Sequence, residues 1–182
     1  MHHYKWAMLM VYVLIFSAAA SAFDGQRKGF VLGAGLGPGI VSTYHIDSVD
    51  ESGAGIGANV IIGYAWNNRN IAVWQLNGNS HNIDAFEHQG EQFYTGPTWY
   101  HYFKTDTQSL YSAVGAWQYA VWEIGEGYQS IGWAFIVGAG YEFARHLQCG
   151  VFYSHAWIRH YPDDRYHGWS SHLNILVTAF AY

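Results

Sequence analysis

Residues 55–66 carry the sequence GIGANVIIGYAW. The odd-numbered positions are mostly small, whereas the even-numbered positions are mostly large and apolar and end in Tyr64 and Trp66. Successive side chains of a β-strand point to opposite faces of the sheet, so a period of two gives a strand two different faces. The pattern predicts a strand with one small face and one apolar face.

The same alternation recurs in residues 131–143 with the parity reversed. Here the odd positions from Ile131 to Phe143 are apolar, while the even positions include Gly132, Gly138, Gly140 and Glu142. In both stretches aromatic residues gather at the ends of the apolar face, as in the aromatic girdles of membrane barrels. A transmembrane helix is excluded for residues 29–46, because glycine or proline at positions 33, 35, 37, 38 and 39 would weaken it repeatedly.

Eight segments of this kind fit the chain, which predicts an all-β fold, a closed antiparallel transmembrane β-barrel of about eight strands. Short connections should follow the second, fourth and sixth strands, and longer loops the others. Barrels of this type place the short turns in the periplasm, so both chain termini are expected there. The predicted strands cover residues 29–41, 53–66, 70–79, 92–103, 109–121, 130–143, 147–159 and 169–182.

The N-terminus has the pattern of a secretory signal peptide. Lys5 precedes an apolar run over residues 6–16, and small residues follow up to Ala22. We expect cleavage after Ala22, which gives a signal peptide over 1–22 and a single barrel domain over 23–182. With one cysteine, Cys149, the chain cannot form an internal disulfide. Charged residues make up only 12% and aromatic residues 19%, a composition that is unusual for a soluble protein.

The last residues, 175–182, read ILVTAFAY, an alternating strand that ends on an aromatic residue. This ending resembles the insertion signal of outer-membrane barrels, with Phe180 and Tyr182 at its key positions. Residues 30–37 (FVLGAGLG) and 138–143 (GAGYEF) add to the likeness. The chain is therefore similar to the small OmpA/OmpX/OmpW-like barrels. The resemblance implies a Gram-negative outer-membrane location, contact with membrane lipid and lipopolysaccharide, and insertion by the barrel assembly machinery.

No constellation in the sequence points to catalysis, a cofactor, a metal or nucleic acid. Ser154 and His155 are adjacent, so they should face opposite sides of their strand and cannot act as a nucleophile and its base. Four histidines near the last long loop lack the spacing of a metal site and are interpreted as solvated or interfacial: His155, His160, His167 and His172.

The interior of the predicted barrel allows two interpretations. The glycines that line it, opposite one another on the first two strands and the sixth, could leave a narrow cavity. Alternatively, inward aromatic residues such as Phe152 fill the space, which is the interpretation we favour. Glu142 is expected to lie inside near the periplasmic end and to pair with a base such as Arg145. The predicted lining residues are Gly33, Gly35, Gly57, Gly63, Gly132, Gly138, Gly140 and Glu142.

The outer loops are expected to be acidic, with only Arg159 and Arg165 as offsetting bases, and to repel phosphate groups unless divalent cations bridge the two. Alternatively, the charges only make the outer loops hydrophilic, which is the interpretation we favour. Taken together, these features predict a non-catalytic barrel with a structural or surface-interaction role and an unknown outer-loop ligand. The alternative is a narrow pore or conduit for small apolar molecules, as in OmpW; a lipid-modifying enzyme is less favoured. The acids assigned to these loops are Asp47, Asp50, Glu51, Asp84, Glu87, Glu91, Glu123, Glu126, Asp163 and Asp164.

Overall fold

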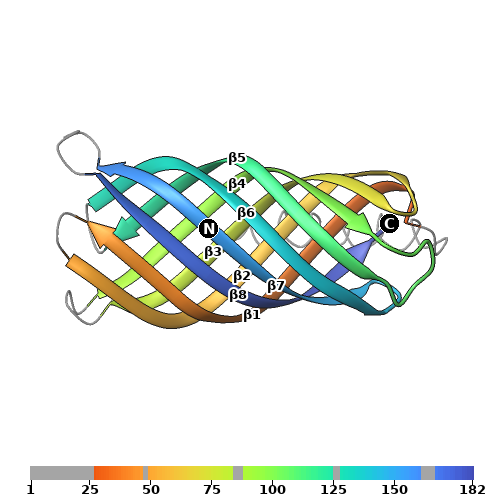
Figure 1. Ribbon diagram of the computed structural model, residues 1–182, viewed down its shortest axis with the longest axis horizontal. Helices are drawn as coiled ribbons and strands as arrows, with labels where there is room; N and C mark the ends of the chain where they lie inside the picture. The colour runs from red at the N-terminus through yellow and green to blue at the C-terminus, as the bar shows by residue number, and fades with distance from the viewer. Residues whose placement is uncertain (1–26, 47–48, 84–87, 125–127, 161–166) are drawn as a thin grey trace, which may run out of the picture.

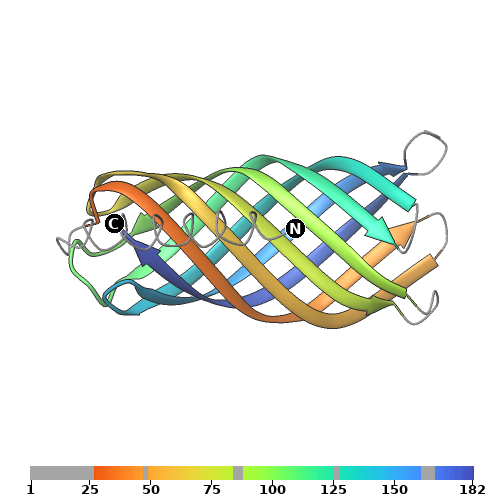
Figure 2. The same ribbon diagram turned by 180° about the vertical axis from the view of Figure 1, so that it is seen from behind.

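The computed structural model describes residues 27–46, 49–83, 88–124, 128–160 and 167–182. They form a closed barrel in which every strand pairs antiparallel with its sequence neighbours and β1 closes the ring with β8 (Figures 1 and 2). This confirms the predicted fold class. The strands are β1 (Gly29–Ile46), β2 (Val49–Asn67), β3 (Asn70–Ile83), β4 (His88–Tyr102), β5 (Leu110–Ile124), β6 (Tyr128–Ala144), β7 (Leu147–His160) and β8 (His167–Ala181).

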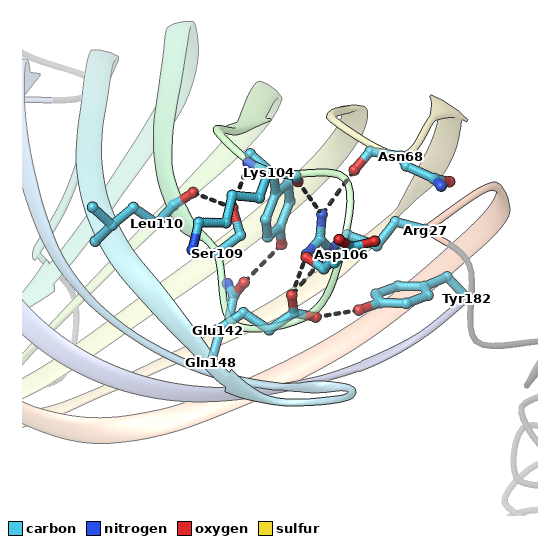
Figure 3. A network of polar contacts seen from close by, with 10 residues as sticks. Arg27, Asn68, Lys104, Asp106, Ser109, Leu110, Glu142, Gln148 and Tyr182 are labelled. Carbon is cyan, nitrogen blue, oxygen red and sulfur yellow. Dashed lines mark hydrogen bonds and ion pairs between the residues drawn. The ribbon is translucent and has the colours of Figure 1, made fainter.

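The two ends of the barrel differ in their connections. At one end, here called the turn end, the chain reverses through short connections after β2, β4 and β6, and each strand boundary there lies within one residue of its prediction. Residues Arg27 and Tyr182, which flank the barrel sequence, lie at this end (Figure 3). The periplasmic placement of both termini stays a prediction.

The opposite end, here called the loop end, departs from the prediction. β1 continues to Ile46 and β2 begins at Val49, and the ladder between them runs on to the pair Ile46↔Val49. The long loop expected over residues 42–52 is therefore mostly strand, because polar residues can extend a hydrogen-bonded ladder beyond the membrane. Strands of 14–19 residues exceed the roughly 9–11 that a tilted strand needs to cross a bilayer.

Side chains alternate between the barrel interior and the outer surface along each strand. On β2, Asn59, Ile61 and Ala65 are buried, whereas Val60 and Tyr64 are exposed. A barrel has two such surfaces, and only the outer one can meet lipid, so the large exposed apolar residues mark the lipid face. No helix in the described part of the chain is long and apolar enough to cross a membrane.

Strands β4 and β5 alternate less cleanly because they carry irregularities. The register of β4 with β5 shifts between Thr95 and Thr98 on β4, and the register of β5 with β6 shifts between Gly115 and Gln118 on β5. In the second shift Trp117 adopts a positive φ of 53° and is 84% exposed. An extra residue of this kind bends a strand and resets which side chains face inward. Pro97, which cannot donate a ladder hydrogen bond, lies within the β4 shift between Thr95 and Thr98.

Candidate functional site

The middle of the barrel interior is filled by aromatic side chains. Tyr100 of β4 lies 5.8 Å from Tyr111 of β5 and 6.0 Å from Phe180 of β8, measured between ring centroids. Phe152 of β7 completes the group at 6.4 Å from Tyr100 and 6.5 Å from Tyr111. All four side chains are buried. An eight-stranded barrel has an interior about wide enough for its own side chains, and here aromatic rings occupy it.

Glycines on β6 make room for these rings. A Cβ at Gly138 would lie 2.4 Å from the ring of Phe152, and one at Gly140 would lie 2.4 Å from the hydroxyl of Tyr111. On β1, a Cβ at Gly33 would meet the ring of Phe180 at 3.2 Å. These glycines therefore face the interior, and aromatic side chains occupy the space next to them.

The glycines of β1 and β2 are covered by polar neighbours instead. A Cβ at Gly35 would lie 2.4 Å from Thr178 Oγ1 and 2.5 Å from Asn59 Oδ1, and one at Gly57 would lie 2.7 Å from Asn174 Oδ1. The remaining predicted glycines also lie on inward faces. Gly63 packs against the backbone and side chain of its partner Val73, and Gly132 pairs with Ala120 and Ile158.

A buried polar layer crosses the interior beside and above the aromatic rings. Tyr100 donates a hydrogen bond to Gln75 Oε1 at 2.8 Å, and Gln75 Nε2 donates to Asn77 Oδ1 at 2.6 Å. Closer to the loop end, Gln92 Nε2 donates to Ser170 Oγ at 2.6 Å, and Gln92 Oε1 contacts His172 Nε2. Buried polar groups cost free energy unless they are hydrogen-bonded, so these pairs fix the inner side chains of β3, β4 and β8.

Arg27 closes the turn end of the barrel (Figure 3). Its buried guanidinium forms an ion pair with Glu142 of β6, with Nε donating to Oε2 at 3.1 Å. The same group donates to the backbone carbonyl of Asn68 at 2.8 Å and to that of Lys104 at 2.9 Å, and also to the carbonyl of Asp106. One side chain thus ties together the segment before β1, the β2–β3 turn, the β4–β5 connection and β6.

Two tyrosines complete this closure. The Arg27 guanidinium carbon lies 4.1 Å from the centroid of the Tyr102 ring, within the range of a cation–π contact. Tyr182 donates its hydroxyl hydrogen to Glu142 Oε1. Burial raises the pKa of Tyr182, and the hydrogen bond to Glu142 raises it further, so the phenol stays a donor. Glu142 therefore accepts hydrogen bonds on both carboxylate oxygens.

The prediction that Glu142 pairs with a base such as Arg145 was wrong. Arg145 lies in the adjacent β6–β7 turn, but its side chain is exposed, and the ion pair is made by Arg27. Short spacing in sequence favoured Arg145, whereas the barrel brings Arg27 to Glu142 across 115 residues of chain. The two residues of the predicted insertion signal, Phe180 and Tyr182, both point inward and are buried.

Among the described side chains, the candidate catalytic and metal-binding residues Ser154, His155 and His172 do not form one site. Ser154 is buried inside the barrel and His155 lies on the outer face, as their adjacency predicted. The interpretation of His172 as solvated or interfacial was wrong, because its side chain is buried in the interior and contacts Gln92. His155 instead contacts Ser171 Oγ at 2.8 Å, a pairing across β7 and β8 that sequence reasoning missed.

Within the described ranges, no three His, Cys, Asp or Glu side chains meet as a metal site requires. The side chains of His160 and His167 lie outside what the structure describes, as do residues Asp163 and Asp164.

Comparison with known proteins agrees with this geometry. Residues 8–175 match the family described as outer membrane protein beta-barrel domain. The chain belongs to this family. Its members are outer-membrane barrels, so the chain is an integral outer-membrane β-barrel protein. No curated protein is similar enough in sequence to match it.

The solved structures that resemble this chain share little of its sequence. Neisserial surface protein A has a TM-score of 0.55 and 15% identity, with 85% of this chain and 97% of that chain covered. Ail of Yersinia pestis, in complex with the heparin analogue sucrose octasulfate, has a TM-score of 0.46 and 14% identity, with 82% and 99% covered. OprG of Pseudomonas aeruginosa has a TM-score of 0.42 and 13% identity, with 85% and 95% covered.

Proposed function

We propose that this barrel acts as a non-catalytic structural or surface-interaction protein of the outer membrane, with an interior that conducts nothing. The observation that carries the proposal is the filled interior. Tyr100, Tyr111, Phe152 and Phe180 occupy its middle, and Arg27 closes its turn end. A barrel with this interior offers its outer surface and its loop end for function. Because one fold hosts many activities, the proposal rests on the chemistry of the interior and the surface and not on the fold.

Export and assembly follow from the same proposal. Residues 1–22 act as a signal peptide that is removed on secretion, and the barrel assembly machinery inserts the remaining chain. Membrane lipid and lipopolysaccharide then surround it. Cell fractionation with mass determination of the membrane-embedded protein tests the expected N-terminus at Phe23.

The loop end is the proposed interaction surface. Asp50, Glu51, Glu91 and Glu123 lie in strands at this end rather than in loops. The other acids assigned to the outer loops lie outside the described residues: Asp47, Asp84, Glu87, Glu126, Asp163 and Asp164. A concentration of carboxylates at one end favours cationic ligands and repels anionic ones.

The first prediction concerns conductance. The purified barrel, shown to be folded by heat-modifiable gel migration, should produce no discrete current steps in a planar bilayer, because buried aromatic rings occupy the middle of the interior and Arg27 bonds across the turn end. Single-channel recording at several voltages measures this directly.

Reproducible steps of defined size would contradict the packed interior and support the narrow-conduit alternative. In that case an Arg27→Ala variant should change their size, because Arg27 lies in the only closure at the turn end that the described residues provide. Lipid A that is altered when the protein is expressed would contradict the non-catalytic part of the proposal.

A further inference from the structure

At the loop end, one strand of the barrel extends beyond its neighbour. The ladder between β2 and β3 ends at the pair Gly55↔His81, although β2 begins at Val49. On its other side the same stretch of β2 stays paired with β1 as far as Ile46↔Val49. Residues 49–54 therefore have a ladder partner on one side and, among the described residues, none on the other. We call this stretch the free edge of β2 (Figure 2).

The gap between β2 and β3 is the largest in the described part of this end. In each of the other seven ladders the last pair lies within two residues of the ends of both strands, as for Ser130↔His160 of β6 and β7. Between β2 and β3, by contrast, residues 49–54 and 82–83 are not paired with each other. The wall of the barrel is therefore open at one place along its rim, and β2 is the longer margin of the opening.

The free edge lies outside the apolar band of the barrel. The outward apolar residues of β2 run from Trp66 to Ile56, and the next outward positions hold Ala54 and Ser52. The ten residues from Trp66 to Ile56 span about 25 Å at about 3.3 Å per residue and a tilt of about 40°, which is the height of such a band. Unpaired backbone groups are costly in lipid but are solvated in water. The ladder is thus complete across the band and opens only where a partner from the aqueous side can reach it.

The sequence of the free edge indicates which partner it suits. Residues 49–54 (VDESGA) contain no lysine or proline, the residues that commonly block a strand edge. They contain the consecutive acids Asp50 and Glu51, and among the described residues Arg159 is the only lysine or arginine near this end. Like charges on paired strands oppose each other, so a second copy of the same edge is disfavoured and a basic strand is favoured. Gly53 has no side chain, which allows another backbone to approach closely.

We propose that the free edge of β2 binds an extended segment of a partner protein that carries lysine or arginine side chains. The segment adds to the sheet as a further strand beside β2. Its backbone hydrogen bonds with the unpaired N–H and C=O groups of residues 49–54 provide affinity, and the charges of Asp50 and Glu51 select basic side chains. The inference rests on the proposed surface-interaction role and gives the chemistry of its partner.

A synthetic peptide in which lysine alternates with valine tests the site, by calorimetric titration of the purified protein in detergent. The peptide should bind, and a peptide with glutamate in place of lysine should not. A lysine peptide whose central backbone nitrogens are methylated keeps its charge but cannot donate ladder hydrogen bonds. Its binding should be at least about tenfold weaker, the effect of losing one or two such bonds.

Reversal of charge on the protein provides the second arm of the test. An Asp50→Lys/Glu51→Lys variant should lose binding of the lysine peptide and gain binding of the glutamate peptide, a gain that an unfolded variant would not show. The matched control is Glu91→Lys, which alters an exposed acid of the same end whose strand is paired on both sides, with Ser80 and with Glu123. This control should bind the lysine peptide as the wild type does.

Three results would overturn the proposal. Equal binding of the methylated and unmethylated peptides would mean that the attraction is electrostatic and that no strand is added. Equal loss in Glu91→Lys and in the Asp50→Lys/Glu51→Lys variant would mean that the whole end attracts cations and that the free edge is not the site. Absence of binding by every peptide would mean that water alone solvates the edge. Conductance by the barrel would contradict the proposed function without altering these comparisons.

Discussion

An Arg27→Ala variant should unfold at a much lower denaturant concentration than the wild-type barrel. Removal of the guanidinium leaves Glu142 as a buried carboxylate whose only remaining side-chain donor in the described structure is Tyr182. It also strips the carbonyls of Asn68 and Lys104 of their donor. Breaking a buried ion pair by removing one partner costs about 3–5 kcal/mol. Urea unfolding of the barrel in lipid vesicles, followed by tryptophan fluorescence, measures the loss.

Two further variants sharpen this test. Lys28→Ala removes the neighbouring base, which is exposed, and should change the free energy of unfolding by no more than about 0.5 kcal/mol. Glu142→Gln should cost less than Arg27→Ala, because Arg27 keeps its backbone acceptors and the amide oxygen still accepts from Tyr182. If Arg27→Ala and Lys28→Ala unfold alike, the buried closure of the turn end does not contribute to stability.

Much of the fold could be predicted because a period of two is a local signal. The turn-end boundaries were the most accurate, since short polar connections such as residues 67–70 interrupt the apolar pattern sharply. Asn67 accepts hydrogen bonds there from the backbone N–H groups of Arg69 and Asn70, a contact that fixes the turn. The loop-end boundaries were less accurate, because residues 42–52 lack a lipid-facing pattern even though their backbones continue the ladder.

The interior was harder to predict because its contacts join residues that are distant in sequence. Period two places Gly138 and Glu142 on the inward face, and the structure has both there. The alternation alone cannot show that Phe152 covers Gly138, or that Arg27 reaches Glu142 across 115 residues of chain. The ring contact between Trp133 and Trp157 was missed for a related reason. Trp133, Trp157 and Trp169 lie on three different strands, and only the register brings their rings together.

A Gly138→Leu variant should fold poorly or lose several kcal/mol of stability. Gly138 pairs directly with Phe152, whose ring lies over it, and a Cβ at this position would be 2.4 Å from the ring and 3.1 Å from the carbonyl oxygen of Val151. Phe152 cannot move aside easily, because it is buried against Tyr100 and Tyr111. Overpacking of a filled core typically costs about 1–3 kcal/mol and occasionally more, and a leucine side chain adds four carbons where there were none. Heat-modifiable gel migration and urea unfolding measure the effect.

The next residue in the chain supplies the matched control. Ala139 faces outward and is exposed, so Ala139→Leu adds carbon atoms to the lipid face, where the bilayer accommodates them, and should leave stability nearly unchanged. A Gly138→Leu/Phe152→Ala double variant should recover part of the loss, because removing the ring frees the volume that the leucine needs.

Equal stability of Gly138→Leu and Ala139→Leu would mean that the interior has room at Gly138. The open-lumen alternative would then regain support, and conductance of the wild-type barrel would be the expected companion result. A large difference between the two variants, with partial rescue by Phe152→Ala, assigns the glycines of β6 to packing. The same residues then cannot serve as the wall of a conduit.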